Sequence, residues 1–423
     1  MRNSDQERQI VVATDHLRLV SHELGERLVQ DTVANSRLGL TLVTLADATA
    51  AGREIARRRA AELPQVQASG DISGLDLLLT ELRTLFAGRY RGWAPTLGKN
   101  RTLTGVQFKP IANAGGVDRP TPAPPPTASA EPTDGAPRRV RVGLLDTRLA
   151  PHSALTGRYI ADTDALLTPV AAGRQRLWWE GHATFIAGVV RRHAPSAVLD
   201  VGSALRPGVV PDEAGGVGDE DWTMAVWDFA ARLGDYQDAG VSVINLSVGV
   251  STEDGQAPLV LERAVAQLTP NVVVVAAAGN HGSGRLTDAE RAAAGLPARG
   301  AALFPAAQDN VLAVGALDGE AAAEFTPRGV GPAETAPWID VFAPGVNVVS
   351  TYLGDGRDEK VLVRDGAGHE ELVDFTGWAA WSGTSVAAGE ITGAVAALLA
   401  GGRTPSDAVA EVRRRYPRPD ADA

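Results

Sequence analysis

Strand-sized apolar runs recur along the chain from about residue 140 onward, and helical patterns separate them. Nearly every position in these runs is apolar, as in strands that a parallel sheet buries on both faces. The alternation predicts a three-layer α/β fold, with a mainly parallel sheet and helices on both of its faces. The six runs are VRVGLLDT, AVLDVGSAL, VSVINLSVG, NVVVVAAAGN, VLAVGAL and DVFAPGVNVVST.

The first 117 residues show a different pattern of strands and helices. It has the strand-like runs IVVAT and LGLTLVTL and helical patterns over 17–29, 48–63 and 75–88. A segment rich in Pro with Ala, Thr and Ser follows, which is typical of an extended, semi-rigid linker. We therefore expect a smaller N-terminal α/β domain over 1–117, a linker over 118–139 and a larger domain over 140–418.

Composition and charge narrow the set of partners. The chain has 423 residues, of which 44% are hydrophobic and 22% charged, and a formal net charge of −11. These proportions are those of an ordinary soluble globular protein. An acidic surface repels phosphate backbones and anionic lipid, so we expect neither nucleic acid nor a membrane as a partner.

The chain contains no cysteine, which excludes disulfides, thiolate zinc sites and a cysteine nucleophile. Its first residues, MRNSDQERQIVVATDHLRLV, show no basic segment followed by an apolar run and a small-residue cleavage site. We therefore expect a cytoplasmic protein without a secretory signal.

Four polar residues at strand ends or helix starts are candidates for chemistry. Asp146 ends the run VRVGLLDT, although an Asp in such a place is more often a loop or cap residue. His182 opens an Ala- and Gly-rich helix, where the positive helix end keeps an imidazole neutral and able to accept a proton. Ser385 lies in the first turn of another small-residue helix, where an ordinary Ser cap is the simpler interpretation. Asn280 follows Gly279 at a strand end, as turn residues do, but its amide can also donate to an oxyanion.

These signals gain strength together, because Asp, then His, then Ser is the chain order of the subtilisin triad. From Val140 to Tyr416 the sequence resembles the subtilisin-like serine peptidase family. The family's Asp-Thr-Gly, Gly-His-Gly-Thr, Gly-Asn and Gly-Thr-Ser-Met-Ala-Ala-Pro signatures appear in order as Asp146-Thr147-Arg148, Gly181-His182-Ala183-Thr184, Gly279-Asn280 and Gly383-Thr384-Ser385-Val386-Ala387-Ala388-Gly389.

The resemblance implies a serine endopeptidase that acts on polypeptides. Asp146, His182 and Ser385 would form its charge-relay set, with Asn280 as the oxyanion donor. An extended substrate would add as a strand to the segment VINLSVG, and Phe304-Pro305 stands where the family has a cis peptide that shapes the specificity pocket. The implied substrate-binding residues are Ser247, Val248, Gly249, Ala278, Gly279, His281, Phe304 and Pro305.

Several departures from the family pattern shape the remaining expectations. Arg148, Ala183 and Gly389 replace a Gly, a Gly and a Pro of the signatures, which leaves open a catalytically impaired homologue that binds extended peptides without cutting them. His281 stands where many relatives carry Glu, so we expect an apolar or aromatic residue, not a cationic one, before the scissile bond. Two polar segments, 282–300 and 352–380, look like insertions, and the second is typical of a hairpin.

The family resemblance also leads to expectations about regulation and cofactors. The N-terminal domain is either an intramolecular inhibitory pro-domain, as in many relatives, or a separate docking domain. Calcium is common in the family, but no loop of regularly spaced carboxylates is present, so we expect no obligatory metal or other cofactor. A nucleotide-binding protein is disfavoured, since no G-x-G-x-x-G or P-loop pattern follows a strand.

Overall fold

The structure is a computed structural model. It describes residues 6–25, 27–66, 72, 74–105, 119–126, 138–168, 175–203, 206–208, 221–293, 296–329, 334–356, 359–364 and 370–419. Of the predicted linker over 118–139, residue 118 and residues 127–137 lie outside the described residues.

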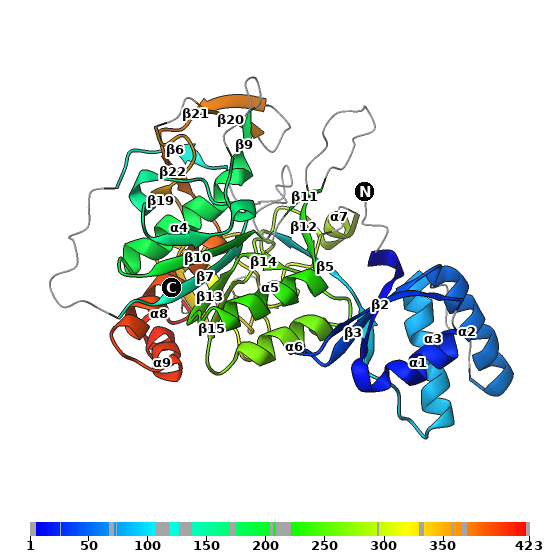
Figure 1. The fold of residues 1–423 in the computed structure, drawn as a ribbon. Helices are drawn as coiled ribbons and strands as arrows, with labels where there is room; N and C mark the ends of the chain where they lie inside the picture. Colours follow the sequence, from blue (N-terminus) through cyan, green and yellow to red (C-terminus); the bar gives the residue numbers. More distant parts are fainter. Residues whose placement is uncertain are drawn as a thin grey trace.

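A central eight-stranded sheet organises the larger part of the chain (Figure 1). Its order is β17-β16-β15-β13-β7-β10-β8, with β18 beside β16, and every pairing except that of β16 with β17 is parallel. The mainly parallel α/β sheet predicted from the apolar runs is therefore confirmed. The strands are β7 (Arg141–Asp146), β8 (Tyr159–Ala161), β10 (Val198–Ser203), β13 (Val243–Leu246), β15 (Val273–Ala277), β16 (Leu312–Asp318), β17 (Ala321–Ala322) and β18 (Val341–Pro344).

Helices cover this sheet on both faces. On one face α4 (His182–His193) packs against α8 (Thr384–Ala400), which lies over β13, β15 and β16 and contacts α9 (Pro405–Arg415). On the other face α5 (Val226–Asp238) packs against α6 (Leu259–Leu268), in front of the sheet in Figure 1. A short helix, α7 (Asp288–Ala293), lies in the first predicted insertion.

The N-terminal part forms a four-stranded antiparallel sheet of order β2-β3-β1-β4, with three helices. Its chain order, strand-helix-strand-strand-helices-strand, is that of a ferredoxin-like unit with a doubled second helix. Its elements are β1 (Gln9–Ala13), α1 (Leu17–Leu24), β2 (Val29–Asn35), β3 (Leu40–Leu45), α2 (Ala48–Glu62), α3 (Gly74–Arg89) and β4 (Leu97–Lys99).

Strand β2 was missed by the sequence pattern, which extended the first helix to Val29. The helix ends at Leu24 because Gly25 adopts a positive φ of 76°. The residues of β2 are almost all exposed, since β2 is an edge strand with no core on either face. Without a buried face, no apolar alternation marks the strand in the sequence.

The small sheet buries both of its faces because successive residues of a strand point to opposite sides. Ile10 and Val12 face the core shared with α2 and α3. Val11, Leu40 and Leu42 belong instead to the core of the larger part. The N-terminal unit therefore has its own core and is also attached to its neighbour through apolar contacts.

Three small sheets surround the carboxyl end of the central sheet. The predicted single strand over 340–351 is in fact two strands in different sheets, because Gly345 and Asn347, with a φ of 53°, turn the chain between them. The first small sheet, of order β11-β12-β5-β14, contains β5 (Thr102–Gly105), β11 (Arg206–Gly208), β12 (Asp221–Ala225) and β14 (Val248–Gly249). The others are β19-β22-β6, with β6 (Thr121–Pro122), β19 (Val348–Thr351) and β22 (Trp378–Trp381), and β21-β20-β9, with β9 (Arg176–Leu177), β20 (Lys360–Arg364) and β21 (Glu370–Asp374).

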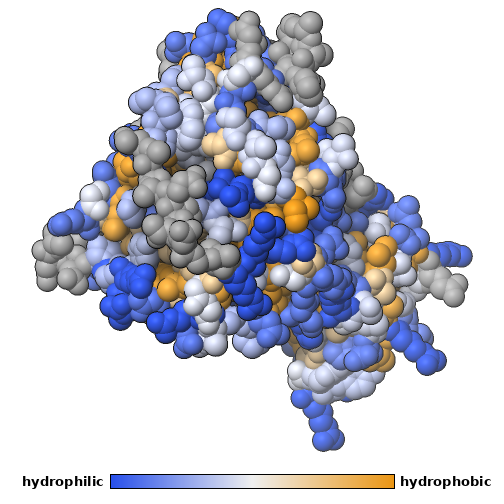
Figure 2. All heavy atoms as spheres, turned by 60° about the vertical axis from the view of Figure 1, so that its left-hand side comes forward, coloured by the Kyte–Doolittle hydropathy of each residue, from blue (hydrophilic) through white to orange (hydrophobic). Residues whose placement is uncertain are grey.

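The surface is polar over the face drawn in Figure 2, where apolar side chains appear in small separate groups among hydrophilic ones. Among the helices that the structure describes, none combines the length and the apolar character needed to cross a bilayer.

Candidate active site

Asp146 and His182 form a buried hydrogen-bonded pair. Asp146 is the last residue of β7, and its Oδ1 lies 2.7 Å from His182 Nδ1 and accepts a second bond from the backbone N–H of Thr147 at 2.7 Å. Both side chains are almost completely buried. A carboxylate can only accept, so Nδ1 carries the proton, and in the neutral imidazole Nε2 is the basic nitrogen.

The chain around His182 holds the imidazole in place. His182 is the first residue of α4, and Gly181 precedes it beneath the ring of Tyr352, where a Cβ would come within 2.2 Å of the ring. Trp381, four residues before Ser385, meets the imidazole edge-to-face with ring centroids 5.3 Å apart. The indole of Trp381 therefore links the histidine helix to the segment that leads into the serine helix.

Ser385 is the second residue of α8 and is fully buried. Gly383, just before the helix, has a φ of 152°, a conformation that favours glycine. Within the described residues, no protein group forms a hydrogen bond with Ser385 Oγ. The hydroxyl thus lies beside the N–H groups of the first helical turn, where developing negative charge is favoured.

Asn280 is oriented by the residue that precedes Ser385. Its Oδ1 accepts from the backbone N–H and from the hydroxyl of Thr384, both at 2.9 Å. Because a backbone N–H can only donate, the amide oxygen must face Thr384, and the NH₂ group is directed away from it. Thr384 Oγ1 also accepts from Gly279 N at 3.1 Å. In the sequence Thr384 stands out only as a part of a signature, and this positioning contact has no signal there.

The predicted peptide-binding edge pairs with the chain's own N-terminal part. Strand β5 runs antiparallel to β14, with Val248 opposite Gly105 and Gly249 opposite Thr104. On its other side β5 pairs with β12. Ser247, just before β14, is fully buried. Val248 and Gly249 are therefore paired with an extended antiparallel strand of the same chain, β5.

The other predicted pocket residues fall into two connected groups. Phe304-Pro305 is a cis peptide bond, and Phe304 exchanges two backbone hydrogen bonds of 2.9 Å with Val250, directly after β14. Ala278 and Gly279 continue the end of β15, where Gly279 has a φ of 105° and lies against the ring of His281.

His281 is held as a neutral imidazole. Its Nε2 donates to the carbonyl of Ala301 at 3.1 Å. Burial lowers the pKa of His281 to about 4; the bond to Ala301 opposes this shift, and the charge of Arg291 adds to it. At neutral pH this position therefore supplies no negative charge of the kind that a glutamate would supply.

The expectation about metals concerns the His, Asp and Glu side chains of the structure. Within its described residues, no three His, Asp or Glu side chains lie close enough together to hold a metal ion.

Comparison with known proteins defines the class. The Subtilase family profile matches residues 138–416, and the chain belongs to this family of subtilisin-like serine peptidases. It is 30% identical over 224 residues to the thermophilic serine proteinase of Bacillus sp. (strain AK1), covering 52% of this chain and 43% of that protein. It is 33% identical over 219 residues to subtilisin Savinase of Lederbergia lenta, covering 51% and 67%.

A solved structure extends the likeness to the fold of almost the whole chain. Fervidolysin from Fervidobacterium pennivorans, described as a keratinolytic enzyme related to subtilisin, matches with a TM-score of 0.51 and 17% identity, over 96% of this chain and 57% of that one. At this identity the likeness concerns the fold alone. The chain spans less than half the length of the Bacillus proteinase.

Proposed function

We propose that the protein is a serine endopeptidase that uses Asp146, His182 and Ser385 as its triad. The observation that carries the proposal is the buried bond of 2.7 Å between Asp146 and His182, which fixes the tautomer with a basic Nε2. Support also comes from the burial of Ser385 in the first turn of α8 and from membership of the subtilase family.

In the proposed mechanism Ser385 Oγ attacks the carbonyl carbon of a peptide bond, and His182 Nε2 takes the hydroxyl proton. The proton then passes to the leaving amine, and water later releases the acyl group from Ser385. Asp146 holds the imidazole and stabilises its charged form. The amide NH₂ of Asn280, directed away from Thr384, and the backbone N–H of Ser385 would stabilise the oxyanion.

The first prediction concerns the nucleophile. We expect a fluorophosphonate probe to label the wild-type protein, and the substitution Ser385→Ala to abolish labelling while leaving thermal unfolding unchanged, because only the attacking hydroxyl is lost. Ser153→Ala, which removes an exposed hydroxyl, serves as the control and should label normally. If wild-type protein from which the N-terminal part has been removed is well folded and stays unlabelled, the impaired, peptide-binding alternative is correct instead.

We further propose that the N-terminal part inhibits the site until it is displaced or cleaved. Its strand β5 occupies the edge at Val248 and Gly249 that a substrate would need. Backbone N–H groups at the start of α5 donate to the two residues just before β5, from Val226 to the carbonyl of Arg101 at 2.8 Å and from Trp227 to Asn100 Oδ1 at 3.1 Å. These bonds satisfy groups that the free helix end would leave without partners.

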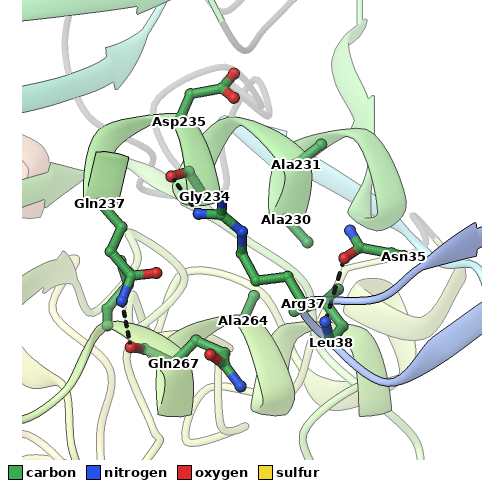
Figure 3. A pocket seen from close by; sticks show the side chains of 11 residues that line it. Asn35, Arg37, Leu38, Ala230, Ala231, Gly234, Asp235, Gln237, Ala264 and Gln267 are labelled. Atoms are coloured by element: carbon green, nitrogen blue, oxygen red, sulfur yellow. Dashed lines mark hydrogen bonds between the residues drawn. The ribbon is translucent and has the colours of Figure 1, made fainter. Parts of the chain in front are cut away.

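A polar contact at the far side of the same interface adds to the attachment. Arg37, in the turn between β2 and β3, reaches into a cavity of about 160 Å³ between α5 and α6 (Figure 3). Its guanidinium donates to Gly234 O at 3.0 Å and forms two bonds with Asp238, at 2.7 and 3.1 Å. The neighbouring helices α5 and α6 thus together form the surface against which the N-terminal sheet packs.

Mass spectrometry of the purified protein tests the inhibitory role. A species that begins after residue 105 should accumulate in the wild type and be absent from Ser385→Ala, since self-cleavage needs the nucleophile. An uncut wild-type chain that is fully active would show that the N-terminal part is a docking domain. The expected cytoplasmic location stays a prediction, which cell fractionation tests. A role in intracellular processing or regulated proteolysis is likewise a prediction.

A further inference from the structure

Residues 119–123 of the chain are bound beside the candidate active site. Strand β6 runs antiparallel to β22, with Pro122 opposite Ala379 and Thr121 opposite Ala380, and Ala123 N donates to Trp378 O at 3.2 Å. In the sheet order β19-β22-β6, it covers the outer edge of β22, which would otherwise be open. Figure 1 shows β6 and β5 at separate places around the central sheet.

One side chain of this segment makes a specific contact. The guanidinium carbon of Arg119 lies 3.8 Å from the centre of the Trp178 ring. Arg119 is half-buried and Pro120 is buried, whereas Thr121 and Pro122 are exposed. The pairing at Thr121 and Pro122 therefore depends on the backbone, and Arg119, over Trp178, is the charged side chain through which the segment can set a sequence preference.

The aromatic platform is built into the candidate active site. Trp178 lies four residues before His182 and packs edge-to-face on Trp381, four residues before Ser385, with centroids 5.7 Å apart. Tyr352 donates its hydroxyl hydrogen to Trp178 O. Burial raises the pKa of Tyr352 well above its usual range, the charge of Glu180 acts the same way and that of Arg119 opposes it. A carboxylate and the guanidinium thus share this neighbourhood.

The second predicted insertion supports the platform. Its hairpin, β20 with β21, pairs in parallel with β9, the strand that leads directly into Trp178. The same insertion ends in β22. The segment over 352–380 therefore supplies both the edge of β22 that β6 covers and the hairpin that supports Trp178.

The direction of the chain indicates on which side of a substrate's scissile bond the edge of β22 lies. Strand β5 comes before β6 in the chain, and both run antiparallel to their partners. A substrate lying in the same direction, with its upstream part at β14, has its downstream part at β22. We propose that Trp178 and the edge of β22 form a downstream subsite that binds an extended polypeptide by its backbone and selects an arginine; this rests on the proposed peptidase function.

Arginine is favoured over lysine because its planar guanidinium stacks on an indole face and is more weakly hydrated. In the uncut chain Arg119 itself fills the subsite. Substrates would replace it once the N-terminal part and residues 119–123 leave.

Quenched fluorescent peptides test the proposal on the full-length protein and its self-processed form. The peptides share one upstream sequence and carry a single arginine, or its neutral analogue citrulline, at each of several downstream positions. At one position we expect arginine to raise kcat/KM by about 5- to 30-fold over citrulline, with a smaller gain for lysine. In Trp178→Leu that ratio should fall to about one, whereas Trp93→Phe, a change in an exposed tryptophan of the N-terminal part, should leave it unchanged.

Equal rates for arginine and citrulline at every position, in protein that the fluorophosphonate probe labels, would overturn the subsite and leave the peptidase function intact. An arginine preference that survives in a folded Trp178→Leu would equally overturn it. The citrulline comparison needs no variant, so it decides the question even where Trp178→Leu does not fold. Failure of both labelling and cleavage would remove the peptidase function, and this inference with it.

Discussion

His281 is an uncharged side chain beside Gly279, and we expect it to influence both specificity and stability. Its bond to Ala301 and its lowered pKa keep it neutral at pH 7. A cationic substrate residue would find no carboxylate at this position. The geometry thus supports the expected apolar or aromatic preference before the scissile bond, and peptide profiling that returned Lys or Arg would contradict it.

The same side chain gives stability a pH dependence of known sign. An unfolded histidine titrates near pH 6.5, whereas folded His281 titrates near 4, so the unfolded chain binds the extra proton between these values. We expect stability to fall as pH drops from 6.5 to 4, with a contribution from His281 on the order of 3 kcal/mol. Urea unfolding of Ser385→Ala with and without His281→Gln measures this contribution.

His22→Gln, which removes an exposed imidazole, is the control for that experiment. Parallel stability curves for the chains with and without His281 would show that the imidazole is not kept neutral by folding.

At this scale the sequence indicated the residues of the proposed triad but not the groups that orient them. Asp146, His182 and Ser385 could be found because their order and local signatures are visible in the chain. The contact between Thr384 and Asn280 joins residues 104 positions apart, and that between Trp381 and His182 exists only after folding. Neither leaves a periodic or compositional signal, so neither could be predicted.

Among the elements, α4 begins with His182 and α8 carries Ser385 in its first turn, and the close packing of these two helices depends on glycine. A Cβ at Gly393 of α8 would lie 2.7 Å from His193 Cβ and 2.7 Å from Val190 O, both on α4. Glu390, one turn earlier and buried, contacts Arg192 and His193 of the same helix. The two helices are therefore both in close contact and joined by charge.

The substitution Gly393→Ala should force these helices apart. We expect a net loss of about 1–3 kcal/mol in the free energy of unfolding, since overpacking outweighs the better helix propensity of alanine. Gly401→Ala is the matched control, because a Cβ there meets only ordinary contacts of 3.4 Å or more. Urea unfolding in the Ser385→Ala background measures the stability of both variants. Equal free energies of unfolding for the two would show that α4 shifts to accommodate the added methyl group without loss of stability.

Element prediction succeeded where a pattern was buried and failed where a strand depended on distant partners. The long apolar strands and the hairpin over 352–380 were predicted because burial or turn residues marked them. Strand β2 is exposed, and β5, β6 and β14 are two to four residues long. Such short strands exist only through pairing between segments far apart in the chain, which no local window reveals.

For the molecule as a whole, the attachment of the N-terminal part combines apolar, backbone and ionic contacts. The pair of Arg37 with Asp238 is exposed, so it is weaker than its geometry suggests and is screened by salt. Arg37 holds the pKa of the Asp238 carboxyl below its usual value through hydrogen bonding and charge.

Removing that pair should speed activation. In Arg37→Ala we expect fluorophosphonate labelling to appear about two- to fivefold faster than in the wild type, and added salt to reduce the difference. Arg232→Ala is the control. Arg232 lies on α5, as Asp238 does, but it pairs with Asp164 within the larger part. Equal labelling rates for Arg37→Ala and the wild type would show that the ionic contact does not restrain the N-terminal part.

Strands β5 and β6 belong to one polypeptide and occupy two separate places on the larger part at once. A ligand attached at two points is held more strongly than at either alone, because the second contact forms at a high local concentration. A cut between residues 105 and 119 separates the two contacts, because β6 stays covalently joined to the larger part whereas β5 does not. Inhibition by the released N-terminal part would then weaken on dilution, whereas inhibition within the uncut chain is independent of protein concentration.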